Sequence, residues 1–188
     1  QRKQIDASGV QYNPYEWLNL EEKCLAIVHD GEVVDSAVAG DEVDVILPKT
    51  GFYVEAGGQV GDTGWLTAND GSWEIEVNGV RRPAAGVIIH FGKVTRGAPR
   101  VGDEVIARVD HDRRMNIMRN HTATHLLHAV LQKHLGEHAR QAGSLVAPDR
   151  LRFDFTHPEA IPADVLDAIQ ADVNRDILAD FPVSVKVK

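Results

Sequence analysis

The sequence contains one cysteine, no excess of positive charge and no long hydrophobic run. The single cysteine, Cys24, cannot form a disulfide within the chain, so a small secreted fold held by disulfides is excluded. No apolar stretch approaches the roughly 20 residues of a membrane-spanning helix, and the first residues, QRKQID, lack the apolar stretch of a signal peptide. We therefore expect no membrane contact and a location in the reducing cytoplasm.

Positive charge is scarce in one half of the chain. The 20 Lys and Arg residues face 28 Asp and Glu, which gives a net charge of −8 and argues against a general basic surface for nucleic acid. Residues 1–110 hold 10 basic and 18 acidic side chains, whereas residues 111–188 hold 10 of each and seven of the nine histidines. This asymmetry predicts two units with different roles, and it predicts that the first avoids polyanions over most of its surface.

The composition is that of a folded chain. Hydrophobic residues make up 43% and charged residues 26% of 188 residues, which suits one large domain or two small ones. The sequence has no initiator Met and ends in the strand-like PVSVKVK. We therefore expect it to be a piece of a longer polypeptide.

Short β-rich runs fill the first half and predict a barrel-like domain over residues 1–110. Turn signals separate the runs, namely Asp30-Gly31, Asn69-Asp70-Gly71 and Asn78-Gly79, because these residues accept positive φ angles. The predicted strands are Leu25 to His29, Asp44 to Leu47, Trp73 to Val77, Val87 to Phe91 and Glu104 to Val109.

A helical period begins near Asp112 and predicts one long helix that stops at Gly136. Strands are predicted over residues 143–146 and 151–155, followed by a helix that starts at Pro162 and a strand over residues 183–187. Residues 111–188 therefore read as an αββαβ two-layer domain, and the fold class of the whole chain as α+β.

His121 and His125 are the strongest candidates for a chemical site. They lie four residues apart and share a helix face, and neutral imidazole suits Zn²⁺. Ordinary packing or solvation of both rings remains the alternative. A zinc protease would carry Glu after the first His, but Thr122 stands there, which argues against peptide hydrolysis. A catalytic zinc also needs a third protein ligand, and we take Cys24 as a buried small residue.

Other polar residues could assist. The hydroxyl of Thr124 could meet a substrate, or it could bond the carbonyl one turn earlier. The glycine-rich segment Gly51 to Gly64 could bring backbone N–H groups to a ligand, or it could form tight turns. Gln141 and Ser144 could orient a substrate or water, or simply start a strand. Several arginines could contact phosphate or form a solvated face: Arg113, Arg114, Arg119, Arg140, Arg150 and Arg152.

Three motifs in one order resemble the editing region of bacterial alanyl-tRNA synthetases. They are GFYVEAGGQVGDTG at residues 51–64, NHTATHLLH at residues 120–128, and QAGSLV at residues 141–146 followed by LRFDF at residues 151–155. The linking stretch VDHDRR at residues 109–114 is also similar, and the likeness extends from about residue 47 to residue 187.

The resemblance implies hydrolysis of the ester that joins Ser or Gly to tRNA(Ala), because an alanine pocket cannot fully exclude these amino acids. It implies that His121 and His125 are zinc ligands, and that Thr124 and Gln141 recognise the aminoacyl group or place water. The loop Gly57-Gly58-Gln59 would border the acceptor end of the tRNA. Substrate contacts are also expected from three further residues: Ser144, Arg114 and Arg140.

One departure limits this expectation. Members of the family complete the metal site with a Cys-x-x-x-His motif farther downstream, and this sequence does not contain one. We therefore expect the chain alone to hold zinc weakly and to be nearly inactive, while the remaining domains of the parent ligate alanine using ATP. Two alternatives stay open: a free-standing deacylase acting in trans, and a tRNA-binding piece without chemistry.

Overall fold

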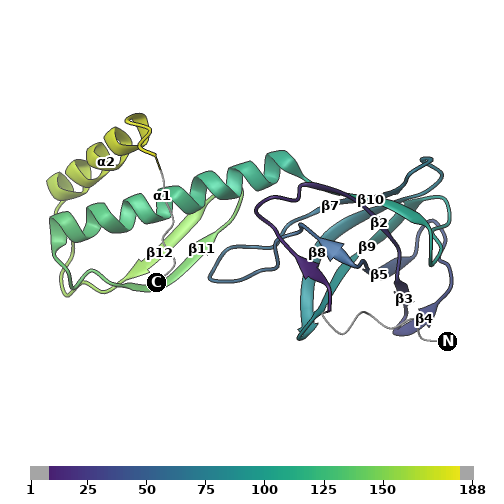
Figure 1. Cartoon of the computed structure of the whole chain (residues 1–188). Coiled ribbons are helices and arrows are strands. Elements are labelled where there is room, and N and C mark those ends of the chain that lie inside the picture. Colours follow the sequence, from purple (N-terminus) through teal and green to yellow (C-terminus); the bar gives the residue numbers. More distant parts are fainter. Residues whose placement is uncertain (1–8, 183–188) are drawn as a thin grey trace. The chain divides into compact units, whose positions relative to one another are not determined.

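A computed structural model describes residues 9–182, with twelve strands and two helices (Figure 1). The contacts divide the chain into two compact units. The first unit comprises residues 1–56 and 60–114, and the second comprises residues 57–59 and 115–188. In the part of the chain that is described, no helix is long and apolar enough to cross a membrane.

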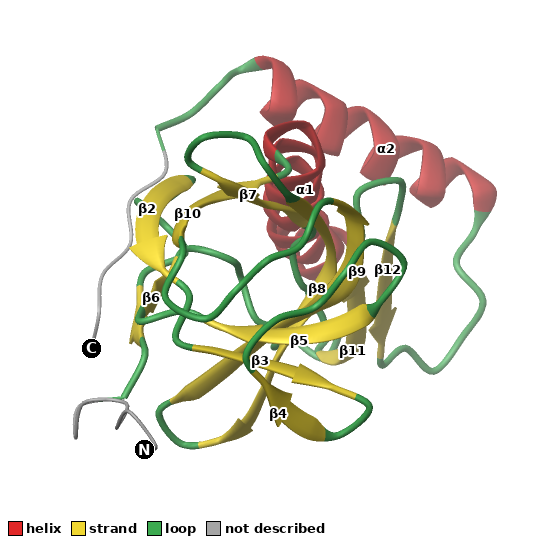
Figure 2. Cartoon of the chain, turned by 90° about the vertical axis from the view of Figure 1, so that its right-hand side faces the viewer, coloured by secondary structure: helices red, strands yellow, loops and turns green. Residues whose placement is uncertain are grey.

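One antiparallel sheet of eight strands builds the first unit, in the order β2-β10-β7-β8-β9-β5-β3-β4. Its strands are β2 (Asn19–Lys23), β3 (Ala26–His29), β4 (Glu32–Val34), β5 (Glu42–Ile46), β7 (Gly64–Ala68), β8 (Glu74–Ala84), β9 (Val87–Arg96) and β10 (Glu104–Val109). The short strands β1 (Gln11–Tyr12) and β6 (Lys49–Thr50) pair in parallel beside it. Figure 2 shows the large sheet curling around its inner face.

The barrel-like closure that the sequence predicts is not confirmed. Within residues 9–182 the end strands β2 and β4 pair with one neighbour each and not with one another, so the sheet is open. The alternation of buried and more exposed residues along a strand still shows which face of the sheet is buried. In β10, Val105, Ala107 and Val109 face the core while the residues between them are more exposed. The interior also holds Phe52 and Leu66, fully buried.

Two turn signals have different outcomes. Asp30 and Gly31 both have positive φ angles, 50° and 81°, and form the predicted tight turn between β3 and β4. The turn predicted at Asn78-Gly79 is wrong, because both residues lie inside β8, where the register with β9 shifts between Val77 and Gly79. Glycine is needed there for space, since a Cβ on Gly79 would lie 2.6 Å from the ring of Phe91.

The second unit contains most of α1 (His111–Leu135), the hairpin of β11 (Gln141–Val146) and β12 (Leu151–Phe155), and α2 (Ala163–Leu178). Val130 and Leu131 of α1 pack against Ile169 of α2, with aromatic side chains of β12 beside them. The α+β class predicted from the sequence is confirmed. The strand predicted at residues 183–187 lies outside the described residues.

One carboxylate ties α2 to α1. Asp172 accepts hydrogen bonds from Lys133 Nζ at 2.7 Å and from His134 Nε2 at 2.9 Å, and it also pairs with Arg175. These donors hold the pKa of Asp172 well below its ordinary value. The helix pair therefore keeps its alignment behind the hairpin that carries Gln141 and Ser144.

A neutral histidine lies in the core of the first unit. His90 is almost fully buried, its Nδ1 donates to the carbonyl of Val45 at 3.2 Å, and its Nε2 accepts from the hydroxyl of Thr50 at 2.8 Å. Burial lowers the pKa of His90 from 6.5 to about 4, because the charged form would lose its hydration. The imidazole is therefore uncharged at neutral pH.

We expect this burial to make the first unit sensitive to acid. Between pH 6.5 and about 4 the unfolded state binds a proton that folded His90 does not, so the free energy of unfolding decreases as the pH falls, by about 3 kcal/mol. Above pH 6.5 this contribution is constant. Urea unfolding followed by tryptophan fluorescence measures it, since Trp17, Trp65 and Trp73 all lie in the first unit. A His90→Gln variant should be less stable at pH 7, but its free energy of unfolding should depend less on pH between pH 6.5 and about 4. An unchanged pH dependence would contradict the assignment of this effect to His90.

Candidate editing site

Two imidazoles lie side by side on α1. The ring centroids of His121 and His125 are 5.1 Å apart and their planes differ by 19°, as expected for residues one turn apart on a helix. Both residues are exposed at the helix surface. Part of each ring is therefore accessible to a ligand.

Gln59 fixes the orientation of His121. Its Oε1 lies 2.6 Å from Nδ1 of His121, and because an amide oxygen can only accept, Nδ1 donates the hydrogen. The lone pair is then on Nε2, the nitrogen left to bind a metal or substrate. Partial burial, and secondly the neighbouring His125, lower the pKa of His121, which favours the neutral ring. Gln59 itself is only 6% exposed.

The tip of the glycine-rich segment, residues 57–59, packs on β11. The N–H of Val146 donates to the carbonyl of Gly58 at 2.8 Å, and Gln59 forms an isolated parallel bridge with Val146. Gly58 has a φ of +83°, and a Cβ there would lie 2.4 Å from the carbonyl oxygen of Ser144. Only glycine fits at this position, because both the backbone conformation and the close approach exclude a side chain.

Neutral polar groups continue from this tip. Gln141 Nε2 donates to the hydroxyl of Ser144 at 3.1 Å, and that hydroxyl donates to the carbonyl of Gly57 at 3.4 Å. Gln141 is exposed at the start of β11. The structure therefore brings together the helix motif, the glycine tip and the start of β11, which the sequence singled out as three separate signals.

Thr124 lies beside the histidines but faces inward. It is 6% exposed, and its hydroxyl donates to the carbonyl of Asn120 at 2.8 Å, which was the packing alternative considered for it. Its oxygen can still accept a hydrogen bond. Sequence reasoning assigned no role to Asn120, whose Nδ2 donates to the carbonyl of Ala147 at 2.7 Å and ties α1 to the end of β11. Its place as the first residue of the motif NHTATHLLH was the only sequence signal for it.

The two arginines predicted to contact substrate differ. Arg140 is exposed just before β11, where its backbone pairs with Thr156. Arg114 is only 5% exposed and belongs to the interior of the first unit. The prediction that Arg114 contacts tRNA is therefore corrected, because its guanidinium is shielded from solvent.

Each nitrogen of the Arg114 guanidinium has at least one acceptor. Its Nε lies 3.0 Å from both carboxylate oxygens of Asp62, and Nη2 donates to the same carboxylate and to the carbonyl of Gly51 at 2.8 Å. Nη1 donates to the carbonyl of Pro14. Such a buried ion pair is structural, since each charge compensates the other away from water.

The donor set suits a metal but is incomplete. Two neutral imidazoles on one helix face fit Zn²⁺ chemically. Among residues 9–182, no group of three His, Cys, Asp or Glu side chains comes close enough to hold an ion. Cys24 is buried in the first unit, where burial raises the pKa of its thiol to about 12 and keeps it protonated. Any further ligand would have to come from outside this part of the chain.

A third imidazole on α1 has an unsatisfied nitrogen. The ring of His128 lies 5.0 Å from that of Phe153, and its Nε2 is buried with no partner in the described structure. An unpaired buried polar atom costs about 1–3 kcal/mol. The sequence showed His128 as the last residue of the motif NHTATHLLH and gave no separate signal for it.

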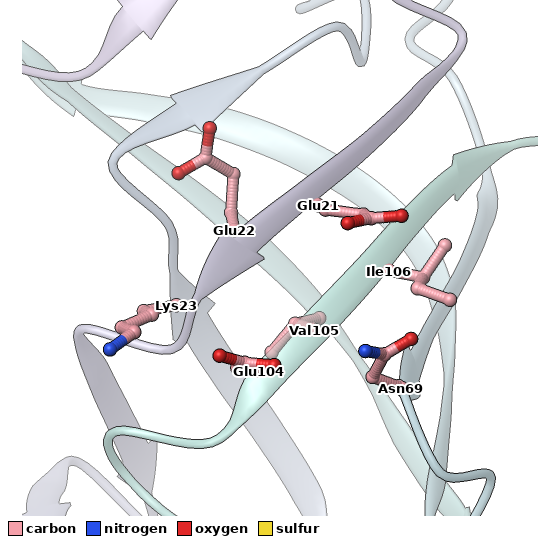
Figure 3. Close-up of a pocket in the computed structure, with 7 residues that line it drawn as sticks. All are labelled: Glu21, Glu22, Lys23, Asn69, Glu104, Val105 and Ile106. Atoms are coloured by element: carbon pink, nitrogen blue, oxygen red, sulfur yellow. The ribbon is translucent and has the colours of Figure 1, made fainter.

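An acidic hollow lies elsewhere on the first unit. Glu21 and Glu104 line it on the neighbouring strands β2 and β10, with Lys23 at one end (Figure 3). Glu22 also borders the hollow and pairs with Lys49 at 3.5 Å. Three carboxylates would repel phosphate groups, so this hollow is unsuited to RNA.

Comparison with known proteins decides the family. The family model described as tRNA synthetases class II (A) matches residues 2–113, which is more than half of the chain. The chain belongs to this family. The resemblance to bacterial alanyl-tRNA synthetases is confirmed by curated relatives. Alanine-tRNA ligases of Chloroflexus aurantiacus, a Roseiflexus species and Thermus thermophilus are 46%, 50% and 47% identical to this chain over 179 residues. Each match covers 95% of this chain, which spans only 20% of the length of those relatives.

The packing of the glycine tip on β11 in this synthetase segment can be tested at the backbone N–H of Val146. Gly57 and Gly58 both have positive φ angles, but only Gly58 faces a close backbone neighbour. We expect Gly58→Ala to displace the tip and to abolish hydrogen-exchange protection of the Val146 N–H, whereas Gly57→Ala has only the conformational cost of roughly 1–2 kcal/mol and keeps it. Exchange measured by NMR distinguishes the variants. Equal protection in both would show that the tip does not dock on β11 as described.

Proposed function

We propose that this chain is the editing part of an alanyl-tRNA synthetase and hydrolyses the ester that joins Ser or Gly to tRNA(Ala). The hydrogen bond from His121 Nδ1 to Gln59 is the observation that carries the proposal. It joins the two motifs that the resemblance assigns to the editing centre, although 62 residues separate them in the sequence. Family membership supports a tRNA synthetase segment, and the geometry supports a hydrolytic site within it.

Editing meets a physical need. A synthetic pocket shaped for alanine cannot strongly exclude the smaller glycine, and one added hydroxyl is discriminated by only about 10²-fold. A second site that hydrolyses the wrong ester supplies the missing selectivity. Such a site needs an accessible surface, polar groups that orient the aminoacyl group, and a means of activating water.

We assign zinc to His121 and His125. When bound there, the ion supplies Lewis-acid chemistry that polarises water or the ester carbonyl. The contribution of the chain is to aim the ligands, since Gln59 holds the hydrogen on Nδ1 and leaves Nε2 for the metal. Two imidazoles make half of a tetrahedral site, so the remaining ligands belong to the rest of the parent protein.

The neighbouring polar groups orient the substrate. Gln141 and Ser144 form a hydrogen-bonded row that ends on the carbonyl of Gly57, and none of the three titrates near neutral pH. Gln141 and Ser144 can each donate or accept a hydrogen bond, so they can hold either the aminoacyl group or the attacking water. Thr124 acts only as an acceptor, because its hydrogen is committed to Asn120. The exposed guanidinium of Arg140 serves a phosphate of the tRNA acceptor end.

The parent protein would have two activities in the cytoplasm. Its other domains ligate alanine to tRNA(Ala) with ATP, and this segment removes Ser and Gly that were attached in error. tRNA(Ala) and those other domains are then its partners.

Hydrolysis of Ser-tRNA(Ala) by the parent synthetase tests the proposal. We expect Gln59→Ala to lower the rate of hydrolysis by about 10- to 100-fold, which is typical of losing a group that orients a metal ligand. His121→Ala removes the ligand itself and should lower the rate by more than that. Alanine ligation should be unchanged in both. His111→Ala is the matched control, because it removes an exposed imidazole from the same helix.

Undiminished hydrolysis in His121→Ala would remove the metal-based editing site. A loss equally large in His111→Ala would show that the helix as a whole, rather than the His121 ring, is responsible.

A further inference from the structure

All three tyrosines of the chain line one cleft in the first unit. Tyr12, Tyr15 and Tyr53 are joined there by Phe91, Arg81 and Arg82, around a cavity of about 660 Å³. This volume lies in the range of roughly 300–1,000 Å³ that is typical of small-ligand sites. The editing chemistry uses none of these side chains.

The two arginines lie against aromatic rings. The guanidinium carbon of Arg82 is 4.9 Å from the ring centroid of Tyr12, and that of Arg81 is 5.6 Å from the centroid of Phe91. Arg81 is also paired with Asp44, whereas Arg82 has no carboxylate partner among residues 9–182. Arg82 therefore presents at the cleft a positive charge that no ion pair with these residues neutralises.

Hydrogen bonds hold the aromatic groups in place before any ligand arrives. The Tyr12 hydroxyl accepts from the N–H of Val54 at 3.1 Å, and the Tyr53 hydroxyl donates to the carbonyl of Ala56 at 3.3 Å. A preformed cleft loses little conformational entropy on binding.

Tyr15 is the exposed member of the group. Its N–H donates to Oδ1 of Asn13 at 3.2 Å, which fixes the turn, and Arg114 donates to the carbonyl of Pro14 in the same turn. The backbone is thus anchored while the side chain remains free, and Tyr15 is 85% exposed. A large aromatic ring on a fixed backbone is suited to stack on a partner.

The chemistry of the cleft matches an unpaired nucleotide. Aromatic faces stack on any nucleobase, and a free guanidinium binds the adjoining phosphate. A base inside a duplex is already stacked on both sides and cannot enter, so the cleft selects single-stranded RNA. The carboxylate of Glu55 also lines the cleft and offsets part of the positive charge of the two arginines. We therefore expect the cleft to bind a single phosphate. Stacking therefore supplies most of the affinity.

We propose that this cleft is a second RNA site, which stacks an unpaired nucleotide of a tRNA on Tyr15 and binds its phosphate through Arg82. It is a local exception to the acidic character of residues 1–110. The site does not depend on ester hydrolysis, so the editing proposal and this one can fail separately.

Fluorescence anisotropy with the 188-residue chain tests the proposal. The probes are a fluorescein-labelled single-stranded RNA hexamer and a blunt RNA duplex of the same sequence. We expect the single strand to bind more tightly than the duplex, and Tyr15→Ala to weaken binding of the single strand by about 5- to 150-fold. Tyr15→Phe keeps the stacking face and should bind like the wild type. Arg82→Gln should reduce the slope of log K against log salt by about 0.7.

Val33→Ala is the control, because Val33 is a similarly exposed apolar side chain of the same unit, outside the cleft. Tryptophan-detected unfolding confirms that each variant is folded. Equal binding of single strand and duplex, unchanged binding in Tyr15→Ala, or an equal loss in Tyr15→Phe would overturn the proposal.

Discussion

The buried ion pair between Arg114 and Asp62 joins the glycine-rich segment to the turn that carries Tyr15. One guanidinium holds the carboxylate of Asp62, the carbonyl of Gly51 and the carbonyl of Pro14. Gly51 and Asp62 lie near the two ends of the glycine-rich segment, whereas Pro14 lies in a turn far away in the sequence. A charge buried among them is stable only while its partner is present. The pair therefore links the glycine-rich segment to the turn that follows β1, next to the pairing of β1 with β6.

The same ion pair holds the two ends of the glycine-rich segment together. Asp62 accepts from the N–H of Tyr53 at 2.6 Å and its own N–H donates to the carbonyl of Tyr53 at 3.0 Å, while Arg113 donates to the carbonyl of Gly61 at 2.7 Å. The chain leaves the sheet and returns to it at a fixed point. The base of the glycine-rich segment and the turn that carries Tyr15 thus share one anchor, the buried charge of Arg114.

Periodic features were predictable from the sequence and buried polar contacts were not. The two helices and the strands β10 and β12 were predicted within two residues, because hydrophobic spacing and Gly136 define them locally. The polar edge strand β2, with sequence NLEEK, carried no β-rich signal. Arg114 was taken for a surface residue because arginine is rarely buried, and only the three-dimensional contacts reveal its partner. The contact between Gln59 and His121 likewise joins distant residues, and motif resemblance was its sole sequence signal.

A double-mutant cycle on Arg114 and Asp62 tests this account most directly. The free energy of unfolding of the first unit, followed by tryptophan fluorescence in urea, is measured for Arg114→Ala, Asp62→Ala and the double variant. Each single variant should lose about 3–5 kcal/mol, and the double variant should lose clearly less than the sum, because removing both partners leaves no unpaired buried charge. Strictly additive losses, or single losses below about 1 kcal/mol as for a surface ion pair, would contradict the central role of this pair.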